Sequence, residues 1–254
     1  MLTDDDLQAA LGAIPVAAPV RAEEVTGSTN ATAVALADQE TPEWTLVSAA
    51  HQTEGRGRVG RTWTDVPDGA LLFSIVLRPS LPPSRAGLLS LLAGACMAEA
   101  IRDVTGRSVS CKWPNDILLH DEKVGGILLE SGVDDGVLRY VVVGVGVNLE
   151  APEGVAGAGA LGARTGQREL LTAFLKRFSS IYRTTDASFP ERVRHAWLPV
   201  SSTIGQMVRA RTLDGKETTG RAVGIDDFGS LQLSTDTGEA RVGFGDVEHL
   251  RPSD

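Results

Sequence analysis

The sequence predicts an α+β protein, in which a mixed β-sheet flanked by helices is followed by a small β-barrel of SH3-like size. Three observations lead to this prediction. Long β-prone runs alternate with helical runs before residue 200, and one helical run is apolar almost all round. After Ser201 the chain changes to short β-like runs separated by turns. We therefore divide the 254 residues into domains 1–200 and 201–254, with a boundary near Pro199–Ser202.

The composition is that of a soluble globular protein, with 42% hydrophobic and 22% charged residues. A net charge of −9 argues against a general nucleic-acid binder. The acidic N-terminus is unlike a secretory signal, and no apolar run approaches the roughly 20 residues that span a bilayer. Cys96 and Cys111 are expected to be buried free thiols, and the scattered histidines show no metal-ligand spacing. We expect a cytoplasmic protein that does not associate with membranes.

Five segments before residue 200 read as helices, one of them over Ala31–Asp38. Thr3–Ala13 has an N-cap threonine followed by acidic residues, and Ser84–Thr105 is an apolar helix that Gly106 ends. Leu170–Thr185 has apolar residues at i, i+3 and i+4, and a second helix covers Pro190–Trp197. The segment Ala17–Arg21 reads as an extended linker.

The β-prone runs are rich in branched and aromatic residues. In the first domain they cover 45–50, 70–78, 117–120, 124–130 and 140–149, with a hairpin turn at 121–123. In the second domain they cover 207–212, 218–225, 231–234 and 240–244. Glycine alternates with valine at 143–147, which indicates a strand face kept bare for a close approach. The Gly- and Ala-rich segment 150–166 is predicted to be a mobile loop.

The most distinctive stretch is His51–Trp63, in which Gly55, Gly57 and Gly60 interleave with three arginines. Such a loop can wrap a small anion with backbone N–H groups and guanidinium forks together. The glycine spacing also fits the dinucleotide-binding fingerprint, which requires a helix directly afterwards. Pro67 and Gly69 exclude that helix, so this interpretation fails. A flexible basic loop without a ligand remains an alternative.

Other polar residues are less distinctive. Ser28 or Thr29 can cap a helix over Ala31–Asp38, and the hydroxyls either only cap it or also face a polar ligand. Lys112 and Lys123 stand beside predicted strands, where a lysine is ordinarily a solubilising charge.

The order of these segments and the residues in them resemble the sequences of the biotin protein ligase family from about Val25 onwards. The matching motifs are Ser28-Thr29-Asn30, the glycine–arginine loop, Lys112-Trp113-Pro114-Asn115-Asp116, Lys123 to Glu130, Gly144 to Asn148 and Gly224 to Gly229. The resemblance implies a catalytic domain of the class II synthetase-like biotin/lipoate ligase type. It also implies a two-step reaction. Biotin and MgATP form biotinyl-5′-AMP, and a lysine of a biotin carboxyl carrier protein domain then attacks the acyl carbon.

The resemblance assigns roles to residues. Lys123, Arg56 and Arg58 are the expected catalytic residues, because positive charge must offset two approaching anions. The expected biotin-binding residues are Ser28, Thr29, Asn30, Gln52, Gly55, Arg56, Gly57, Arg58, Lys123, Gly125 and Gly126. The expected ATP or adenylate contacts are Arg56, Arg58, Arg61, Trp63, Lys112, Asn115 and Asn148, with Asp116 as a candidate Mg²⁺ contact. Trp113 is either an apolar wall of the site or a core residue.

The sequence also departs from part of the family. Only about 27 residues precede Ser28, too few for the N-terminal DNA-binding domain of bifunctional members, so we expect no DNA binding and a monomer or weak dimer. An acid, Glu54, precedes the first loop glycine. A lipoate ligase or octanoyl transferase of the same fold remains the rival enzyme. A non-enzymatic nucleotide-binding interaction module is the rival from another class.

Overall fold

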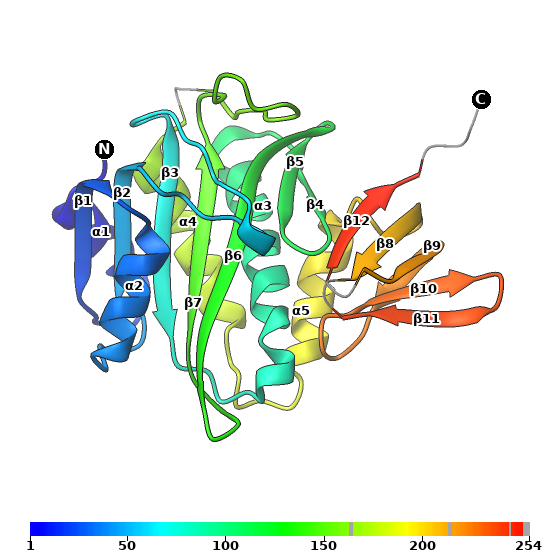
Figure 1. The fold of residues 1–254 in the computed structure, drawn as a ribbon. Helices are drawn as coiled ribbons and strands as arrows, with labels where there is room; N and C mark the ends of the chain where they lie inside the picture. Colours follow the sequence, from blue (N-terminus) through cyan, green and yellow to red (C-terminus); the bar gives the residue numbers. More distant parts are fainter. Residues whose placement is uncertain (163–164, 213–214, 244, 251–254) are drawn as a thin grey trace.

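The computed structural model describes residues 1–162, 165–212, 215–243 and 245–250. A seven-stranded sheet with the order β1-β2-β3-β7-β6-β5-β4 forms the first domain, and a five-stranded sheet with the order β11-β10-β9-β8-β12 follows it (Figure 1). In the large sheet β1 pairs with β2 in parallel, and β2 pairs with β3 antiparallel, so the predicted mixed sheet is confirmed.

Strands β2, β6 and β7 are longer than the β-prone runs alone indicated, whereas β3 and β5 are not. Their bounds are β1 Val20–Thr26, β2 Leu46–Gln52, β3 Ala70–Leu77, β4 Ser110–Lys112, β5 Asp116–Leu119, β6 Glu122–Asp134 and β7 Val137–Asn148. The predicted hairpin is present between β5 and β6, but its turn is formed by His120 and Asp121, and Glu122 and Lys123 already belong to β6. A second hairpin joins β6 to β7 through Asp135 and Gly136, both of which adopt positive φ.

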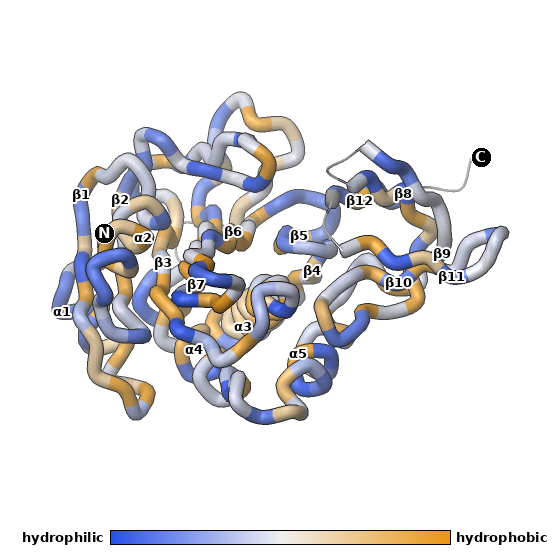
Figure 2. Tube along the Cα trace, turned by 60° about the horizontal axis from the view of Figure 1, so that its bottom comes forward, coloured by the Kyte–Doolittle hydropathy of each residue, from blue (hydrophilic) through white to orange (hydrophobic). Residues whose placement is uncertain are grey.

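Helices cover both faces of this sheet, but unequally. Helices α1 (Asp4–Leu11), α3 (Gly87–Thr105), α4 (Gln167–Ile181) and α5 (Phe189–Trp197) lie on one face, and α2 (Thr29–Asp38) lies on the other. Alternation along each strand sorts the side chains between the faces. Phe73 and Val143 enter the larger core, whereas Val76 and Val142 pack against α2. Figure 2 shows hydrophobic colour along β3, which lies inside the sheet.

The helix ends follow the sequence signals closely. Thr3 and Asp6 form a reciprocal capping box at the start of α1. Gly106 ends α3 with a φ of 70°, a conformation that glycine adopts without strain. Helix α3, with the turn before it, is long and apolar enough to cross a membrane by composition, yet 72% of that stretch is buried inside the protein. Its apolar surface is therefore explained by packing against the sheet and α4.

The C-terminal sheet consists of β8 (Met207–Thr212), β9 (Glu217–Ile225), β10 (Leu231–Thr235), β11 (Gly238–Val242) and β12 (Gly245–His249). It is antiparallel and SH3-like, and its order runs from β11 to β12 without a closing strand pair among the described residues. Residues from both domains share one core, which includes Val208 and Leu231. Trp113 joins the domains: its backbone N–H donates to Thr203 Oγ1 at 2.9 Å and its indole N–H donates to the Gly229 carbonyl at 3.0 Å. Trp113 is thus a core residue.

Some sequence predictions were wrong. The linker prediction fails at Val20 and Arg21, because these residues begin the edge strand β1. The strand was not predicted because it contains the charged residues Arg21, Glu23 and Glu24, which an edge strand tolerates. Helix α3 starts at Gly87, after a short 3₁₀ turn at Pro83–Arg85. Strand β12 was missed, and the prediction for 240–244 ends at Phe244, which lies outside the described residues. The same holds for 163–164 of the predicted loop, and for 213–214 and 251–254 of the predicted second domain.

Candidate functional site

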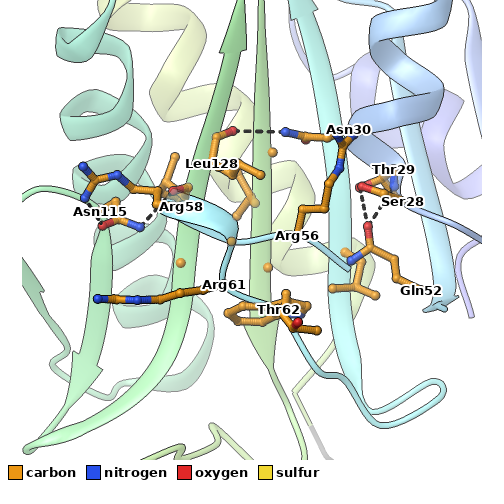
Figure 3. A pocket seen from close by; sticks show the side chains of 18 of the residues that line it. Ser28, Thr29, Asn30, Gln52, Arg56, Arg58, Arg61, Thr62, Asn115 and Leu128 are labelled. Atoms are coloured by element: carbon orange, nitrogen blue, oxygen red, sulfur yellow. Dashed lines mark hydrogen bonds between the residues drawn. The ribbon is translucent and has the colours of Figure 1, made fainter. Parts of the chain in front are cut away.

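A pocket of about 100 Å³ opens on the face of the sheet that carries α2, beside the start of that helix. The glycine–arginine loop crosses in front of it (Figure 3). The lining residues come from the start of α2, the end of β2, the loop, and the strands β3, β5, β6 and β7. The structure therefore brings together segments that lie far apart in the sequence.

Part of the floor of the pocket consists of glycine backbone without side chains. Gly126, Gly144 and Gly146 of neighbouring strands β6 and β7 line it. A Cβ on Gly146 would lie 2.7 Å from the Trp63 ring, and one on Gly144 would lie 2.0 Å from Asn30 Oδ1. The alternation of glycine and valine thus does serve a close approach: Trp63 and Asn30 rest on the bare strand.

One end of the pocket is polar and uncharged. Gln52, at the end of β2, accepts through Oε1 from the Thr29 N–H at 2.8 Å and from the Thr29 hydroxyl at 3.1 Å. Ser28 occupies the N-cap position of α2, but its side chain makes no capping hydrogen bond. Gln52 therefore satisfies the N–H at the helix start, and the Ser28 hydroxyl is available to the pocket that it lines.

The other end is cationic, and each cation has an internal acidic or amide partner. Arg56 pairs with Glu130 at 3.1 Å, and Lys123 Nζ lies 2.5 Å from Asp116 Oδ1. Arg58 donates to Asn115 Oδ1 at 3.2 Å. These residues surround one space, so a bound anion would compete with the internal partners.

Asp246 of β12 reaches the same end from the C-terminal sheet. It forms an ion pair with Arg61 and lies 3.7 Å from Arg58 Nη1. Burial lowers the pKa of Arg58, while the negative charges of Asp246 and Asp116 act in the opposite direction. The second domain thus supplies a charged residue to the pocket rim.

The glycine–arginine loop is itself a small hairpin. The Trp63 N–H donates to the Gly55 carbonyl at 2.9 Å, and the Gly57 N–H donates to the Arg61 carbonyl at 2.7 Å. A Cβ on Gly55 would lie 2.4 Å from the Trp63 carbonyl oxygen, so this crossing needs glycine. Val59 at the tip is exposed and adopts a φ of 53°, which β-branched residues rarely do.

Most of the predicted site residues line this pocket. They are Ser28, Thr29, Asn30, Gln52, Arg56, Gly57, Arg58, Arg61, Trp63, Asn115, Asp116, Lys123 and Gly126. Four others lie elsewhere. Gly55 lies against the Trp63 carbonyl of the loop, and Gly125 lies against the Gly146 carbonyl of β7. Asn148 is buried, and its Nδ2 donates to the Gly159 carbonyl at 3.1 Å. Lys112 faces a neighbouring depression shared with Arg209 and Arg211 of β8.

Sequence reasoning missed several lining residues. Asp246 carried no signal, because it is an ordinary acidic residue in a short β-run 185 residues from Arg61. Leu72, Ile127 and Leu128 read as core positions. Leu72 and Leu128 line the pocket through the alternation of their strands, which the apolar runs alone do not reveal.

The glycine floor leads to a prediction. We expect Gly146→Ala to displace the Trp63 ring and to raise the ligand concentration needed for half-maximal rate about tenfold or more, because the added methyl overlaps the ring. Steady-state kinetics over a ligand titration measures this. Gly87→Ala is the control, since its Cβ would meet only the Phe228 carbonyl oxygen at 3.6 Å. Equal kinetics in the Gly146→Ala variant and wild type would contradict the close packing.

Comparison with known proteins agrees with the geometry. The family model described as "Biotin/lipoate A/B protein ligase family" matches residues 23–148, and the model described as "Biotin protein ligase C terminal domain" matches residues 203–250. The biotin--[acetyl-CoA-carboxylase] ligase of Paracoccus denitrificans is 34% identical, over 87% of this chain and 97% of its own. The bifunctional ligase/repressor BirA of Bacillus subtilis is 33% identical, over 89% of this chain and 72% of its own. The structure of a biotin protein ligase from Aquifex aeolicus in complex with biotin and ATP superposes with a TM-score of 0.75 at 27% identity, covering 92% of this chain and 99% of that one.

Proposed function

Because this chain belongs to the biotin protein ligase family, we propose that it joins biotin to a carrier protein in two steps. In the first step biotin and ATP give biotinyl-5′-AMP and pyrophosphate. In the second step a lysine of a biotin carboxyl carrier protein domain receives the biotinyl group and AMP leaves. The names of the relatives favour biotin over lipoate, although the first family model covers both ligase types.

The observation that carries this proposal is the polarity of the pocket. Its uncharged end, made by Thr29, Asn30 and Gln52, suits a ureido ring with both donors and acceptors. Its cationic end, made by Arg58 and Lys123, suits a carboxylate that meets a phosphate. Biotin carries those two groups at its opposite ends.

The first step brings together two anions. The biotin carboxylate attacks the α-phosphorus of ATP, an oxygen–phosphorus bond forms, and the bond to pyrophosphate breaks. We assign Lys123, Arg56 and Arg58 to offset the repulsion between carboxylate and phosphate and to stabilise the charge on the transferring group. Arg61 and Trp63 line the same pocket, and we assign them to the nucleotide.

The second step breaks the acyl–phosphate bond. The neutral amine of the carrier lysine attacks the acyl carbon, an amide bond forms, and AMP departs with the bonding electrons. The same cations would stabilise the leaving phosphate. The carrier lysine must reach the acyl carbon beside Lys123, at the end of the pocket where Asp246 of the C-terminal sheet forms part of the rim.

Metal binding by the protein alone is not indicated. Among the described residues no group of three or more His, Cys, Asp and Glu side chains could hold a metal ion. Asp116 forms an ion pair with Lys123, and Asn115 Oδ1 accepts a hydrogen bond from Arg58. The oxygen donors Asp116 and Asn115 nevertheless fit a Mg²⁺ ion held mainly by phosphate and water, which is how this ion is ordinarily bound beside nucleotides. When bound, it would neutralise phosphate charge, and we propose that it arrives with ATP.

Asn148 is proposed to approach the adenine, through an atom that the fold leaves without a partner. Its Oδ1 is buried and accepts no hydrogen bond, whereas its Nδ2 donates to the Gly159 carbonyl at 3.1 Å. A buried acceptor without a donor is costly. The exocyclic amine of an adenine would supply that donor once the segment around Gly159 moves.

We infer that the protein works in the cytoplasm as a monomer or weak dimer and binds neither DNA nor membranes. A net charge of −9 supports the expectation on DNA, since phosphate binding needs a basic surface.

The proposal is tested by measuring pyrophosphate release from ATP with biotin and with lipoate in parallel, followed by transfer to an isolated carrier domain. We expect release with biotin only, and then incorporation of biotin into the carrier lysine. Release with lipoate alone would support the rival ligase. Absence of release with either acid would leave only the non-enzymatic nucleotide-binding module.

A further prediction concerns the two loops at the site, residues 53–61 and 150–162. Because both combine glycine with few apolar contacts, we expect fast hydrogen exchange in the free protein. Biotinyl-5′-AMP should slow exchange at least in 53–61, since the anion would hold its arginines together. Hydrogen exchange followed by mass spectrometry measures this, with helix α3 as an internal reference. Equally slow exchange in both states would contradict it.

A further inference from the structure

Ser74 is a buried hydroxyl in an otherwise apolar stretch of β3, and the reaction as described does not use it. Its relative exposure is 0%. It lies on the same face of the sheet as Leu72 and Val76, and its cross-strand neighbours are Gly144 and Val47. Burying a hydroxyl costs free energy unless it is hydrogen-bonded, and alanine would fill this position without that cost. The hydrogen bonds of Ser74 are therefore expected to have a role.

The Ser74 hydroxyl connects the residues at the uncharged end of the pocket. It donates to Asn30 Oδ1 at 2.6 Å, and its oxygen lies 2.9 Å from Thr29 Oγ1. The Thr29 N–H donates to Gln52 Oε1, and the single proton of the Thr29 hydroxyl is shared between two acceptors, Gln52 Oε1 and Ser74 Oγ. A continuous hydrogen-bonded chain therefore runs from Gln52 through Thr29 and Ser74 to Asn30.

This chain determines which atoms the two amides present. The carbonyl oxygens of Asn30 and Gln52 both point into the chain, where they accept hydrogen bonds. Asn30 Nδ2 donates to the Leu128 carbonyl at 3.4 Å, so the opposite amide orientation would set two oxygens against each other. The Gln52 nitrogen is on the side of its amide away from Thr29 (Figure 3). The Gln52 Nε2 hydrogens and the second hydrogen of Asn30 Nδ2 are thus the donors that the two amides can offer to a ligand.

We propose that Ser74 is a positioning residue for ligand recognition: it orients Asn30 and Thr29 so that the uncharged end of the pocket offers N–H donors to a ligand carbonyl oxygen. The inference rests on the proposed function, in which that oxygen belongs to the ureido ring of biotin. It further implies that the site selects against a ligand that carries N–H donors at this point.

Gly144 makes the arrangement possible. Asn30 lies against Gly144, directly beside Ser74, and a Cβ there would be 2.0 Å from Asn30 Oδ1. The bare strand and the hydroxyl therefore act on the same atom: the glycine makes room for the amide oxygen, and Ser74 hydrogen-bonds it. Without that hydrogen bond, only the 3.4 Å hydrogen bond from Nδ2 to the Leu128 carbonyl fixes the orientation of the Asn30 amide.

The test compares Ser74→Ala with Ser48→Ala. Ser48 is an equally buried serine on neighbouring β2 whose hydroxyl donates to the Leu72 carbonyl at 2.7 Å, on the opposite face of the sheet. Pyrophosphate release is measured with biotin and with 2-iminobiotin, which carries an N–H donor where biotin has its carbonyl oxygen. We expect Ser74→Ala to raise the KM for biotin about tenfold or more with kcat changed less than about twofold, since an oriented hydrogen bond is lost. Its preference for biotin over 2-iminobiotin should fall by a similar factor.

The control should lower stability without changing this preference, and urea titration of each variant separates the two effects. An unchanged KM and preference in Ser74→Ala, or the same rise in Ser48→Ala, would overturn the inference. Ser74→Cys keeps the volume with a weaker donor and should give an intermediate preference, which provides a second measurement if Ser74→Ala fails to fold. Absence of biotin-dependent release in the wild type would instead reject the proposed function itself.

Discussion

Replacement of Lys123 by alanine is expected to slow adenylate formation about a hundredfold or more while the fold is retained. The ammonium group is placed where carboxylate and phosphate would meet, and its removal withdraws charge stabilisation from that point. It also leaves Asp116 without its partner at 2.5 Å, so an extra negative charge would face the anionic reactants. Single-turnover measurement of pyrophosphate release at saturating biotin and ATP gives the rate.

The partner suggests a sharper version of this experiment. In the double variant Lys123→Ala/Asp116→Asn the uncompensated carboxylate is gone, so we expect part of the lost rate to return. Lys176→Ala is the control, because Lys176 is exposed on α4, on the opposite face of the sheet. Near wild-type turnover in Lys123→Ala would remove this lysine from the catalytic assignment.

The second large effect concerns Trp113. Trp113→Ala is expected to lower the free energy of unfolding by about 3–5 kcal/mol, as is typical when a buried tryptophan is truncated. Only 2% of the side chain is exposed, and its indole N–H is bonded to the Gly229 carbonyl in the other domain. Urea denaturation followed by circular dichroism measures the change.

Trp63→Ala provides the contrast. Trp63 lines the pocket, and its indole nitrogen has no hydrogen-bond partner in the structure. We expect this variant to lose less stability than Trp113→Ala and to lose more of its affinity for the ligand. If Trp113→Ala unfolds at the same urea concentration as wild type, the two domains do not share a core in the way that the structure indicates.

How much of the site the sequence could reveal depends on the kind of residue. The glycine–arginine loop and Lys123 were found because each belongs to a sequence motif of the family, and both line the pocket. Gly144 and Gly146 gave a partial signal, since alternation with valine indicated a bare strand face but not what lies against it. Trp63 and Asn30 pack on that face, and in the sequence they are about 80 residues from Gly146 and about 110 residues from Gly144, respectively.

Other features depend on tertiary contacts with no local pattern. Asp246 becomes a site residue only because β12 pairs with β8 and carries it to Arg61. Ser74 did carry a signal, as one hydroxyl within the apolar run 70–77, and a search for such interruptions would have found it. Strand β1 was hidden because a sheet edge accepts charged residues, so its sequence lacks the hydrophobic alternation of an inner strand.

The distribution of the four tryptophans has an optical consequence. Trp63 borders the pocket, whereas Trp44, Trp113 and Trp197 are buried, with 8%, 2% and 1% exposure. An indole beside a bound nucleotide changes its fluorescence emission, while indoles inside a rigid core report little of what binds elsewhere. Titration of the protein with ligand should therefore give an emission change that comes mainly from Trp63, and Trp63→Phe should abolish most of it. The wild-type chain thus carries its own spectroscopic probe of occupancy, without any attached dye.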